Sequence, residues 1–390
     1  MPAWGYPAWE WLLCAFVIVF PYGGYPLCLW LWSRFSRGLA SASHEAHSPT
    51  VAMVVAAYNE EKIIAEKIQN FLDLDYPKNK RTLYIGSDGS TDRTHDIVAR
   101  FQAADVKLQI FPRMGKANVL NRLVEKTTQE ILVFSDANTL FASDALKQLV
   151  DPFRHGQVGC VCGRLKLLDP VRNDEDQGGE GFYWKFETWL KRHESRLGLV
   201  MGANGGIYAL RRSLWQTLPS NVINDDFTAS MQVYLQHAYM VYAEQAQANE
   251  YVAPSWQSEF RRHIRDGAGH YLALFHLWRL LGYIKKPGLC FVFWGHRVLR
   301  WLAPAALLIQ AWLVIQYRML PVFQALFVIE LIGVALMLAT GIMALCRIKI
   351  HKALWIPFYF LMVNTALLVG AIKLLLGLQS NRWVSTERVS

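Results

Sequence analysis

The sequence predicts an α/β domain with a mostly parallel β-sheet, held between membrane-spanning α-helices. Two observations support this fold class. Apolar blocks lie at both ends of the 390-residue chain, whereas its 71 charged residues (40 basic plus 31 acidic) fall mostly between Arg34 and Arg300. Between the blocks, short apolar runs alternate with helical patterns, as strands and helices do in parallel sheets. With 53% hydrophobic residues, the chain is too apolar for soluble domains alone, and disorder and fibrous repeats are excluded.

The first apolar block predicts a transmembrane helix within residues 1–33, followed by a linker over residues 34–48. Residues 11–32 carry no charge and are long enough to cross a hydrocarbon core of about 30 Å at about 1.5 Å per residue. A signal peptide is the alternative, but Glu10 precedes the block, whereas Arg34 and Arg37 follow it. This order of charges favours a retained anchor with its amino terminus outside.

Repeated strand-and-helix units are predicted at the start of the central domain, which we assign to residues 49–269. Apolar runs at residues 51–57, 82–86, 106–111 and 130–134 each lead into a polar turn or a helical pattern. In parallel sheets, ligands bind beyond the carboxyl ends of the strands. Five polar side chains of the sequence fall there: Tyr58, Glu60, Asp88, Asp136 and Asn138.

These strand ends carry carboxylates but no glycine-rich phosphate-binding motif. No GxGxxG follows the first strand and no GxxxxGK[ST] occurs, so a dinucleotide fold or a P-loop has no support. Carboxylates suit instead a divalent cation, Mg²⁺ or Mn²⁺, that neutralises a diphosphate, with oxygen ligands from Asp136 and Asn138. Arg113 and Lys116 add positive charge at the start of the next helix.

The second half of the chain returns to apolar segments. Residues 270–288 predict an amphipathic helix at the membrane surface, and residues 181–198 show a similar pattern; core-facing helices are the alternative for both. Apolar runs then predict about three transmembrane helices over residues 289–378, before a tail over residues 379–390. Four spans place the central domain in the cytoplasm with Arg297 and Arg347 inside, but Arg382 then falls outside, which leaves open a re-entrant last segment. We expect an integral protein of the bacterial inner (plasma) membrane.

The formal charge of +9 fits nucleic acid, anionic lipid or a phosphate-bearing substrate. Nucleic acid is not an expected partner, because the basic residues concentrate near the membrane segments rather than among aromatic residues. Membrane lipids and a phosphate-bearing ligand are the expected partners. The six cysteines are expected to be reduced and structural, since Cys160 and Cys162 have no second pair at metal-site spacing.

Six motifs follow one another along the central domain, and together they resemble the membrane-integrated family 2 glycosyltransferases, relatives of cellulose, chitin and hyaluronan synthases. The motifs are AYNEE at 57–61, SDGSTD at 87–92, GKANVLN at 115–121, SDAN at 135–138, GANGG at 202–206 and NDDF at 224–227. The resemblance implies a GT-A fold, in which a nucleotide-sugar-binding α/β domain has a mostly parallel sheet, together with transmembrane and interfacial helices.

The resemblance also implies roles on the donor side. Tyr58, Glu60 and Asp88 would hold the base and ribose of a nucleotide. Lys116 would lie near the nucleotide or its diphosphate, where Arg113 adds positive charge.

The resemblance further implies a metal ligand and a base. Asp136 would be the principal metal ligand, although the Asp-x-Asp common in the family is Asp136-Ala137-Asn138 here and lacks one negative charge. Asp226 matches the general base of the family, and Asp225 is the second catalytic candidate, because its charge would raise the pKa of Asp226. The alternative for this pair is an amino-terminal helix cap.

The acceptor side departs from the family. Processive members carry Gln-x-x-Arg-Trp, where this chain has EFRRH at 259–263. Arg262 would still face the diphosphate with Arg265 nearby, whereas His263 replaces the aromatic platform or is a solvated member of a basic helix. The acceptor-binding candidates are Gly202, Asn204, Trp256 and His263.

These features predict an inverting glycosyltransferase that moves a sugar from a nucleotide-diphosphate sugar, UDP-linked, to a membrane-associated acceptor. Inversion needs a base at the acceptor oxygen and separate stabilisation of the departing diphosphate. The acceptor is a lipid or a growing polysaccharide, and a processive synthase that secretes its polymer stays open. A nucleotide-binding transporter or regulatory membrane protein without chemistry is the alternative from another class. An oligomer or an accessory subunit is also left open.

Overall fold

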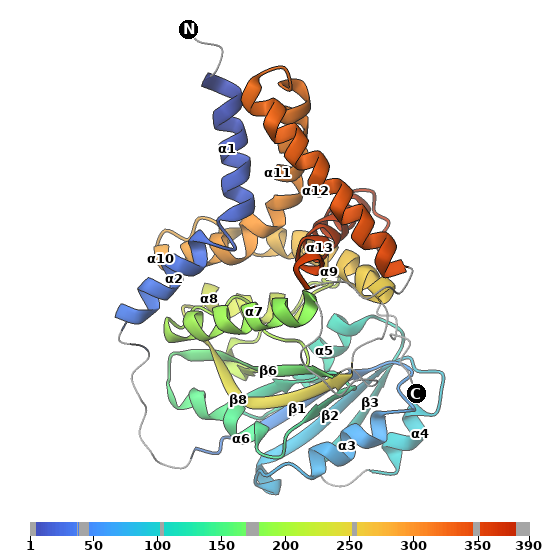
Figure 1. Ribbon diagram of the computed structural model, residues 1–390. Coiled ribbons are helices and arrows are strands. Elements are labelled where there is room, and N and C mark those ends of the chain that lie inside the picture. The colour runs from blue at the N-terminus through green and yellow to red at the C-terminus, as the bar shows by residue number, and fades with distance from the viewer. Residues whose placement is uncertain are drawn as a thin grey trace.

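A mixed eight-stranded sheet forms the centre of the protein, and helices cover both of its faces (Figure 1). The computed structural model describes residues 5–36, 38, 47–101, 105–168, 179–251, 256–345 and 352–379. The strands are β1 (Val51–Ala57), β2 (Arg81–Asp88), β3 (Val106–Phe111), β4 (Ile131–Phe134), β5 (Thr139–Phe141), β6 (Val158–Leu168), β7 (Tyr208–Arg211) and β8 (Tyr239–Tyr251). Their order in the sheet is β3-β2-β1-β4-β7-β6-β8-β5.

The first half of the sheet is parallel. β1 pairs in parallel with β2 and β4, and β2 pairs in parallel with β3. β7 then runs antiparallel to β4 and β6, whereas β6 and β8 are parallel and β5 is antiparallel to β8. The predicted α/β class with a mostly parallel sheet is confirmed, and the carboxyl ends of β1, β2 and β4 lie at one edge, as expected.

The middle of the sheet is buried on both faces, where β1 and β4 consist of apolar residues. Every residue of β1 is buried. Helices α3 (Ile64–Leu72), α4 (Thr94–Ala99) and α6 (Ala145–Val150) contribute to the core on one face. Helices α5 (Lys116–Glu125), α7 (Gly179–Arg196) and α8 (Asp225–Leu235) contribute to the core on the other face. Residues 181–198 therefore fall in a core-facing helix, with Leu190 and Glu194 fully buried.

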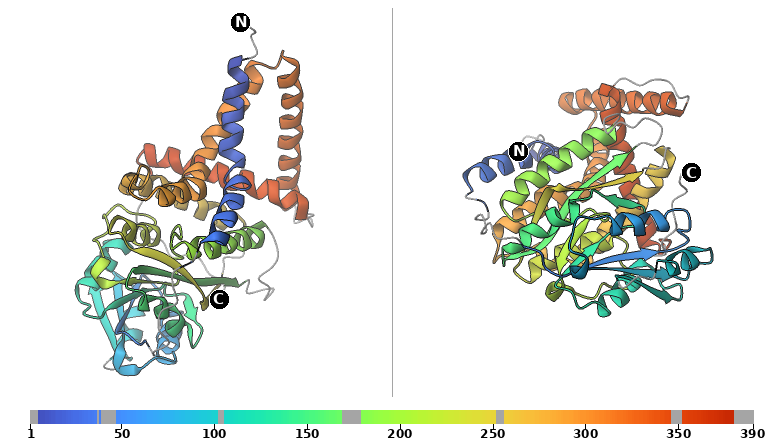
Figure 2. Two further views of the ribbon diagram at one scale, coloured as in Figure 1. Left: turned by 90° about the vertical axis from the view of Figure 1, so that its left-hand side faces the viewer. Right: turned by 90° about the horizontal axis from the view of Figure 1, so that it is seen from below.

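The remaining helices form a layer above α7 and α8 and an upright group beyond it (Figure 2). They are α1 (Gly5–Val19), α2 (Gly24–Phe35), α9 (Trp256–His276), α10 (Pro287–Phe293), α11 (Leu299–Gln316), α12 (Pro321–Leu345) and α13 (Lys352–Leu375). By length and composition, three described segments could cross a membrane: Pro287–Gln316, Pro321–Met343 and Leu354–Leu375. The last of these, α13, runs across the direction of α1, α11 and α12 (Figure 2, left).

The predicted first transmembrane helix is broken in the structure. Segments Ala8–Val19 and Gly24–Phe35 meet at 54°, so they make a fourth candidate span only as a bent pair. The break falls at Pro21, Gly23 and Gly24, where proline and glycine interrupt a helix readily. After the break, Tyr25 and Leu29 of α2 are fully buried, and the Tyr25 hydroxyl donates to Glu194 on α7 at 2.6 Å. The second half of this apolar segment thus docks on the central domain.

The predicted surface helix over residues 270–288 also differs from the structure. Helix α9 starts at Trp256 and continues without interruption through residue 269 to His276, and α10 starts only at Pro287. Helix α9 packs closely on α13, since a β-carbon on Gly370 would lie 2.5 Å from the Ile264 carbonyl oxygen. A β-carbon on Gly267 would likewise lie 3.0 Å from the Leu367 Cα. Glycine is required at this crossing because the two backbones touch.

Candidate active site

An ion-pair chain links three sequence-predicted residues at the strand ends. The Lys116 Nζ, at the start of α5, lies 2.9 Å from Asp136 Oδ1 and 3.3 Å from Asp225 Oδ2. Asp136 follows β4, and Asp225 begins α8. Burial alone would lower the pKa of Lys116, but Asp136 and Asp225 hold that pKa above its ordinary value. The ammonium group of Lys116 therefore lies between Asp136, the predicted metal ligand, and Asp225 of the predicted catalytic pair.

The carboxyl group of Asp226 has a raised pKa. Burial, followed by the charge of Asp225, raises the pKa of Asp226 to about 7, while Lys116 opposes the rise. Its Oδ1 accepts a hydrogen bond of 2.7 Å from the Phe227 N–H, which also fits the start of a helix. A carboxyl with this pKa can accept and release a proton near neutral pH. This is the property that a general base needs.

The glycine-rich loop over residues 202–206 lies against the start of α8. Gly202 has φ of +96°, and a β-carbon on it would lie 2.5 Å from Phe227 Cδ2. A β-carbon on Gly205 would lie 2.9 Å from Asp226 Oδ2. The loop backbone thus borders the candidate base, and side chains larger than hydrogen do not fit at these two positions.

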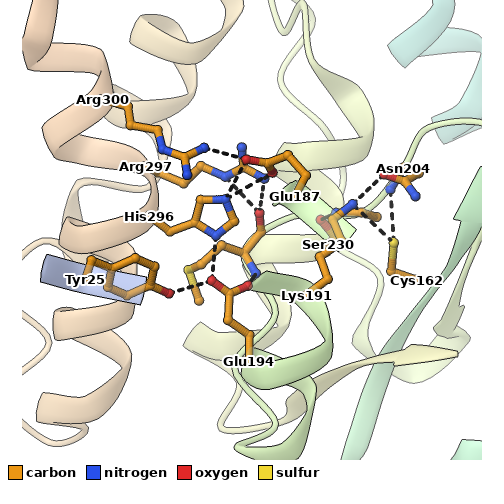
Figure 3. A network of polar contacts seen from close by, with 12 residues as sticks. Tyr25, Cys162, Glu187, Lys191, Glu194, Asn204, Ser230, His296, Arg297 and Arg300 are labelled. Atoms are coloured by element: carbon orange, nitrogen blue, oxygen red, sulfur yellow. Dashed lines mark hydrogen bonds and ion pairs between the residues drawn. The ribbon is translucent and has the colours of Figure 1, made fainter. Parts of the chain in front are cut away.

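Asn204 uses its side chain within the protein. Its Oδ1 accepts from the Lys191 Nζ, its Nδ2 donates to the Gly163 carbonyl at 2.8 Å, and its backbone N–H donates to Cys162 Sγ at 3.3 Å (Figure 3). Both polar atoms of the amide are therefore engaged. Asn204, predicted to bind the acceptor, fixes the loop to the sheet in this structure.

The nucleotide candidates form a compact unit at the ends of β1 and β2. The Arg113 guanidinium lies 3.3 Å from the centre of the Tyr58 ring, and its Nη1 lies 2.5 Å from Asp88 Oδ2. Asp88 is buried, and its Oδ1 also accepts from the Met114 and Gly115 N–H groups at 2.6 and 3.0 Å. Asp88 therefore holds Arg113 over Tyr58. Glu60 is buried beside them, with its N–H bonded to Thr94 Oγ1 at 2.9 Å.

The metal candidates are separated by their hydrogen bonds. Asn138 Nδ2 donates to Glu250 Oε1 at 2.8 Å, so this amide is held by β8 rather than by Asp136. Within the described residues, no group of three His, Cys, Asp or Glu side chains could hold a metal ion. A hard cation that brings diphosphate and water oxygens needs only one or two protein carboxylates. Asp136 fits such a cation, and the amide oxygen of Asn138 remains the predicted second ligand, because the bond to Glu250 uses only the amide nitrogen.

The remaining candidate residues all lie on helix α9, but those side chains that the structure describes interact with different partners. The positive charge of Arg265 helps lower the pKa of Asp136, after the larger effects of burial, which raises it, and Lys116. The charge of Arg262 helps to lower the pKa of Glu259, which lies one turn earlier on α9. His263 lies 3.4 Å from Glu259 Oε1 and 3.3 Å from the hydroxyl group of Tyr359 on α13. It therefore faces α13, which contains a candidate membrane span, and not the aspartates. The side chain of Trp256 lies outside the described part of the chain.

Two side chains at the site were missed by the sequence analysis. Lys67 of α3 is fully buried, and its Nζ donates to Ser135 Oγ at 2.7 Å and to the Thr139 carbonyl at 2.5 Å, on either side of Asp136. Burial lowers its pKa to about 7. The sequence contained a signal for this residue, because Lys67 falls on the apolar face of α3 together with Ile64 and Ile68.

The second missed side chain is Tyr208. Its buried hydroxyl has no hydrogen-bond partner among the described residues. Burial raises the pKa of Tyr208, and the charges of Asp225 and Asp226 raise it further. The Tyr208 hydroxyl is therefore a buried polar atom without a partner in the described part of the chain, within the field of two aspartates.

Comparisons with known proteins extend the resemblance. Residues 52–217 match the sequence model of "Glycosyl transferase family 2". A beta-monoglucosyldiacylglycerol synthase from Nostoc sp. is 29% identical over 195 residues, which cover 48% of this chain and 42% of that protein. A poly-beta-1,6-N-acetyl-D-glucosamine synthase from Staphylococcus epidermidis is 24% identical over 216 residues, covering 52% and 50%. The chain thus spans half or less of the length of these curated relatives.

A solved structure matches over nearly the whole chain. A mannosyltransferase from Pyrobaculum calidifontis, in complex with GDP-Man and Mn²⁺, has a TM-score of 0.67 at 22% identity, and the match covers 94% of this chain and 99% of that chain. At this identity the likeness shows the fold, which includes the helices attached to the α/β domain.

Proposed function

Because residues 52–217 form a glycosyl transferase family 2 domain, we propose that the chain is an inverting glycosyltransferase that uses a nucleotide-diphosphate sugar and a membrane-associated acceptor. The family and the GT-A fold expected from the sequence are confirmed by the comparisons, and the reaction is our proposal. The observation that carries it is Asp226, whose pKa is raised to about 7 beside a separate charge-stabilising group, Lys116.

Asp226 is the proposed base. It takes the proton of the acceptor hydroxyl as the acceptor oxygen attacks the anomeric carbon of the donor sugar. The bond from that carbon to the diphosphate breaks on the opposite side, and its electron pair leaves with the nucleoside diphosphate. Attack and departure on opposite faces invert the configuration of the anomeric carbon.

Lys116 is the proposed partner of the departing diphosphate. It is neutralised by Asp136 and Asp225 before the donor binds, and a diphosphate would compete with those carboxylates for its ammonium group. Arg265 adds positive charge on the same side. A divalent cation, Mg²⁺ or Mn²⁺, held by Asp136, would neutralise diphosphate charge when bound.

Tyr58 and Arg113 are the proposed binding residues for the base of the nucleotide. Their stacked ring and guanidinium offer a flat surface to a base, and Asp88 keeps the guanidinium there. Under this proposal Asp88 acts on the nucleotide through Arg113. A UDP-linked donor stays our prediction from the motif resemblance.

The acceptor is proposed to come from the membrane side. Helix α9 and the layer of helices beside it lie between the α/β domain and the upright helices (Figure 1). The relatives named above include one synthase named for a diacylglycerol product and one named for a polymer. A cytoplasmic domain at a bacterial inner membrane is part of the proposal, because Arg34 lies in the last turn of α2 and Arg297 and Arg300 pair with Glu187 of the central domain.

Purified protein incubated with labelled sugar nucleotides, with and without lipid extract, tests this function. A lipid carrying one sugar indicates single transfer, and a high-mass product indicates a polymerase. Asp226→Asn should abolish transfer while nucleotide binding persists, whereas Asp75→Asn, at an exposed surface ion pair with Lys147, should match the wild type. Nucleotide binding with no transfer to any fraction of the extract would favour a binding protein without chemistry.

A further inference from the structure

The peptide groups of Met201, directly before the glycine-rich loop, are held on both sides by charged side chains. The Met201 N–H donates to Glu194 Oε2 of α7 at 3.1 Å. The Met201 carbonyl accepts two bonds from Arg297, from Nε at 2.9 Å and from Nη2 at 2.5 Å. These two side chains come from different parts of the protein (Figure 3). Glu194 belongs to α7 of the central domain, whereas Arg297 belongs to the candidate membrane segment Pro287–Gln316.

Arg297 lies on a local distortion of that segment. Residues Trp294–Val298 form a π-helical turn, with α11 following directly. A π turn rotates the side chains that follow it relative to an α-helix, and such turns occur often at functional sites. His296 on the same turn also contacts the domain: its Nδ1 lies 2.5 Å from Glu194 Oε1, and its Nε2 lies 3.1 Å from Glu187 Oε2.

These contacts form a buried cluster that anchors Arg297. Glu194 and His296 are fully buried, and Arg300 bonds Glu187. Burial alone would raise the pKa of both glutamates, but His296 and the neighbouring arginines hold it below the ordinary value. Tyr25 of α2 adds a bond to Glu194. The turn bearing Arg297 is therefore fixed to α7 by several charged contacts, not by one surface pair.

The loop held in this way borders the reacting carboxylate. The Ala203 N–H donates to Ser230 Oγ of α8 at 3.1 Å, Gly202 lies against Phe227, and Gly205 lies against Asp226. The Arg297 guanidinium also lies 5.7 Å from the centre of the Phe227 ring. If Arg297 no longer bonded the Met201 carbonyl, the glycine-rich loop beside Asp226 would lose its bonds to the segment Pro287–Gln316.

We propose that Arg297 is a positioning residue: it fixes the loop over residues 201–206 against Asp226, so that the π-turn helix sets the geometry of the acceptor side. This inference rests on the proposed function. The donor side is anchored elsewhere, by Asp88, Arg113 and Lys116, and is independent of this contact. A purely structural brace would affect donor and acceptor steps alike, whereas a positioning residue affects the acceptor step.

The test compares Arg297→Lys and Arg297→Ala with Arg279→Ala, an exposed arginine in the same layer of helices. Arg297→Lys keeps the charge but not the two-pronged contact with the carbonyl. We expect kcat/KM for the acceptor to fall by up to about 10²-fold in Arg297→Ala, as loss of alignment does, and by less in Arg297→Lys. KM for the donor and thermal unfolding of Arg297→Lys should match the wild type, and Arg279→Ala should match it throughout.

Hydrogen–deuterium exchange of peptides over residues 199–206 supplies a readout that needs no turnover. Faster exchange in both Arg297 variants, with unchanged exchange in β1 and α5, is expected. Unchanged exchange in this loop overturns the inference whether or not the protein transfers sugar, as does an equal fall in donor and acceptor steps. Failure of the wild type to transfer any sugar, with faster loop exchange in the variants, contradicts the proposed function and leaves the loop contact established.

Discussion

Gly205 passes so close to Asp226 that a β-carbon on the glycine would lie 2.9 Å from the Asp226 Oδ2. The contact joins two motifs that lie about 20 residues apart in the sequence. It shows why the loop needs glycine at this position, since the backbone itself forms one wall around the carboxylate. The surroundings of Asp226 are thus set by main-chain atoms as well as by charged neighbours.

Gly205→Ala should reduce sugar transfer by roughly 10²-fold without loss of nucleotide binding, because the added methyl must displace the loop or the carboxylate. The measurement is steady-state transfer together with nucleotide binding. Gly156→Ala is the matched control, since no described atom lies within 4 Å of a β-carbon there. Full activity of Gly205→Ala would mean that the acceptor does not approach past this loop.

The pH dependence of transfer should report Asp226. Only the deprotonated carboxylate accepts a proton, so kcat should rise with pH and reach half of its plateau near pH 7, the value to which burial and Asp225 raise the pKa. Below that pH the rate should fall about tenfold per pH unit. A flat profile from pH 5 to 8 under chemistry-limited conditions would remove Asp226 from the role of base.

Asp226→Asn should stabilise the protein at neutral and higher pH. The folded-state pKa of about 7 lies above the unfolded value of about 3.9, so the folded state binds more protons between these values. The wild type therefore loses stability as pH rises from about 4 to 7, at about 1.4 kcal/mol per unit of pKa difference, and the amide variant does not. Thermal unfolding in detergent at pH 5 and pH 8 measures this: the gain in Tm from the substitution should be larger at pH 8.

Lys67→Met should lower the free energy of unfolding by about 1–3 kcal/mol, because it leaves the buried Thr139 carbonyl without its donor. It should also weaken donor binding, since the Ser135 and Thr139 contacts hold the turn that carries Asp136. Chemical denaturation and nucleotide titration check the two effects. Lys62→Met, at an exposed position just before α3, should change neither.

Removal of divalent cations should stop transfer but leave the fold unchanged. A chelator deprives the diphosphate of its counter-ion, while no three-residue metal cage among the described residues depends on the ion. Transfer measured in chelator and after addition of Mg²⁺ or Mn²⁺, beside Tm in the same buffers, tests both parts. Undiminished transfer in chelator would show that Lys116 and the arginines suffice for the leaving group.

The sequence predicted the sheet well because its signals are local. The apolar run at 51–57 coincides with β1, whose residues are all buried, as in the interior of a parallel sheet. The run at 106–111 coincides with β3, the partly exposed edge strand. Strand ends then place Asp88 and Asp136 at one edge without further information. Lys116, Asp136 and Asp225 were likewise found by motif, and the structure brings all three into contact.

Side-chain direction and long-range partners could not be predicted in this way. Asn138 follows the right strand but bonds Glu250, which lies on β8 far along the chain. His263 stands in a motif-like position but turns toward Tyr359 of the last described helix. The contact between His296 and Glu194 joins residues 102 positions apart, and no local pattern encodes it. One continuous helix was predicted through Pro21 and Gly23, and the docking of α2 on α7 after the break could not be predicted from a local pattern.

The tight crossing of α9 and α13 has a consequence for biosynthesis. Helix α9 packs through Gly269 against Asn224, the residue before the aspartate pair, since a β-carbon on Gly269 would lie 2.3 Å from the Asn224 Oδ1. Its partner α13 spans Lys352–Leu375. A ribosome therefore completes every strand of the sheet well before it makes the helix that braces α9. During that interval the nascent domain has its described strands but not α13, the helix that packs against α9.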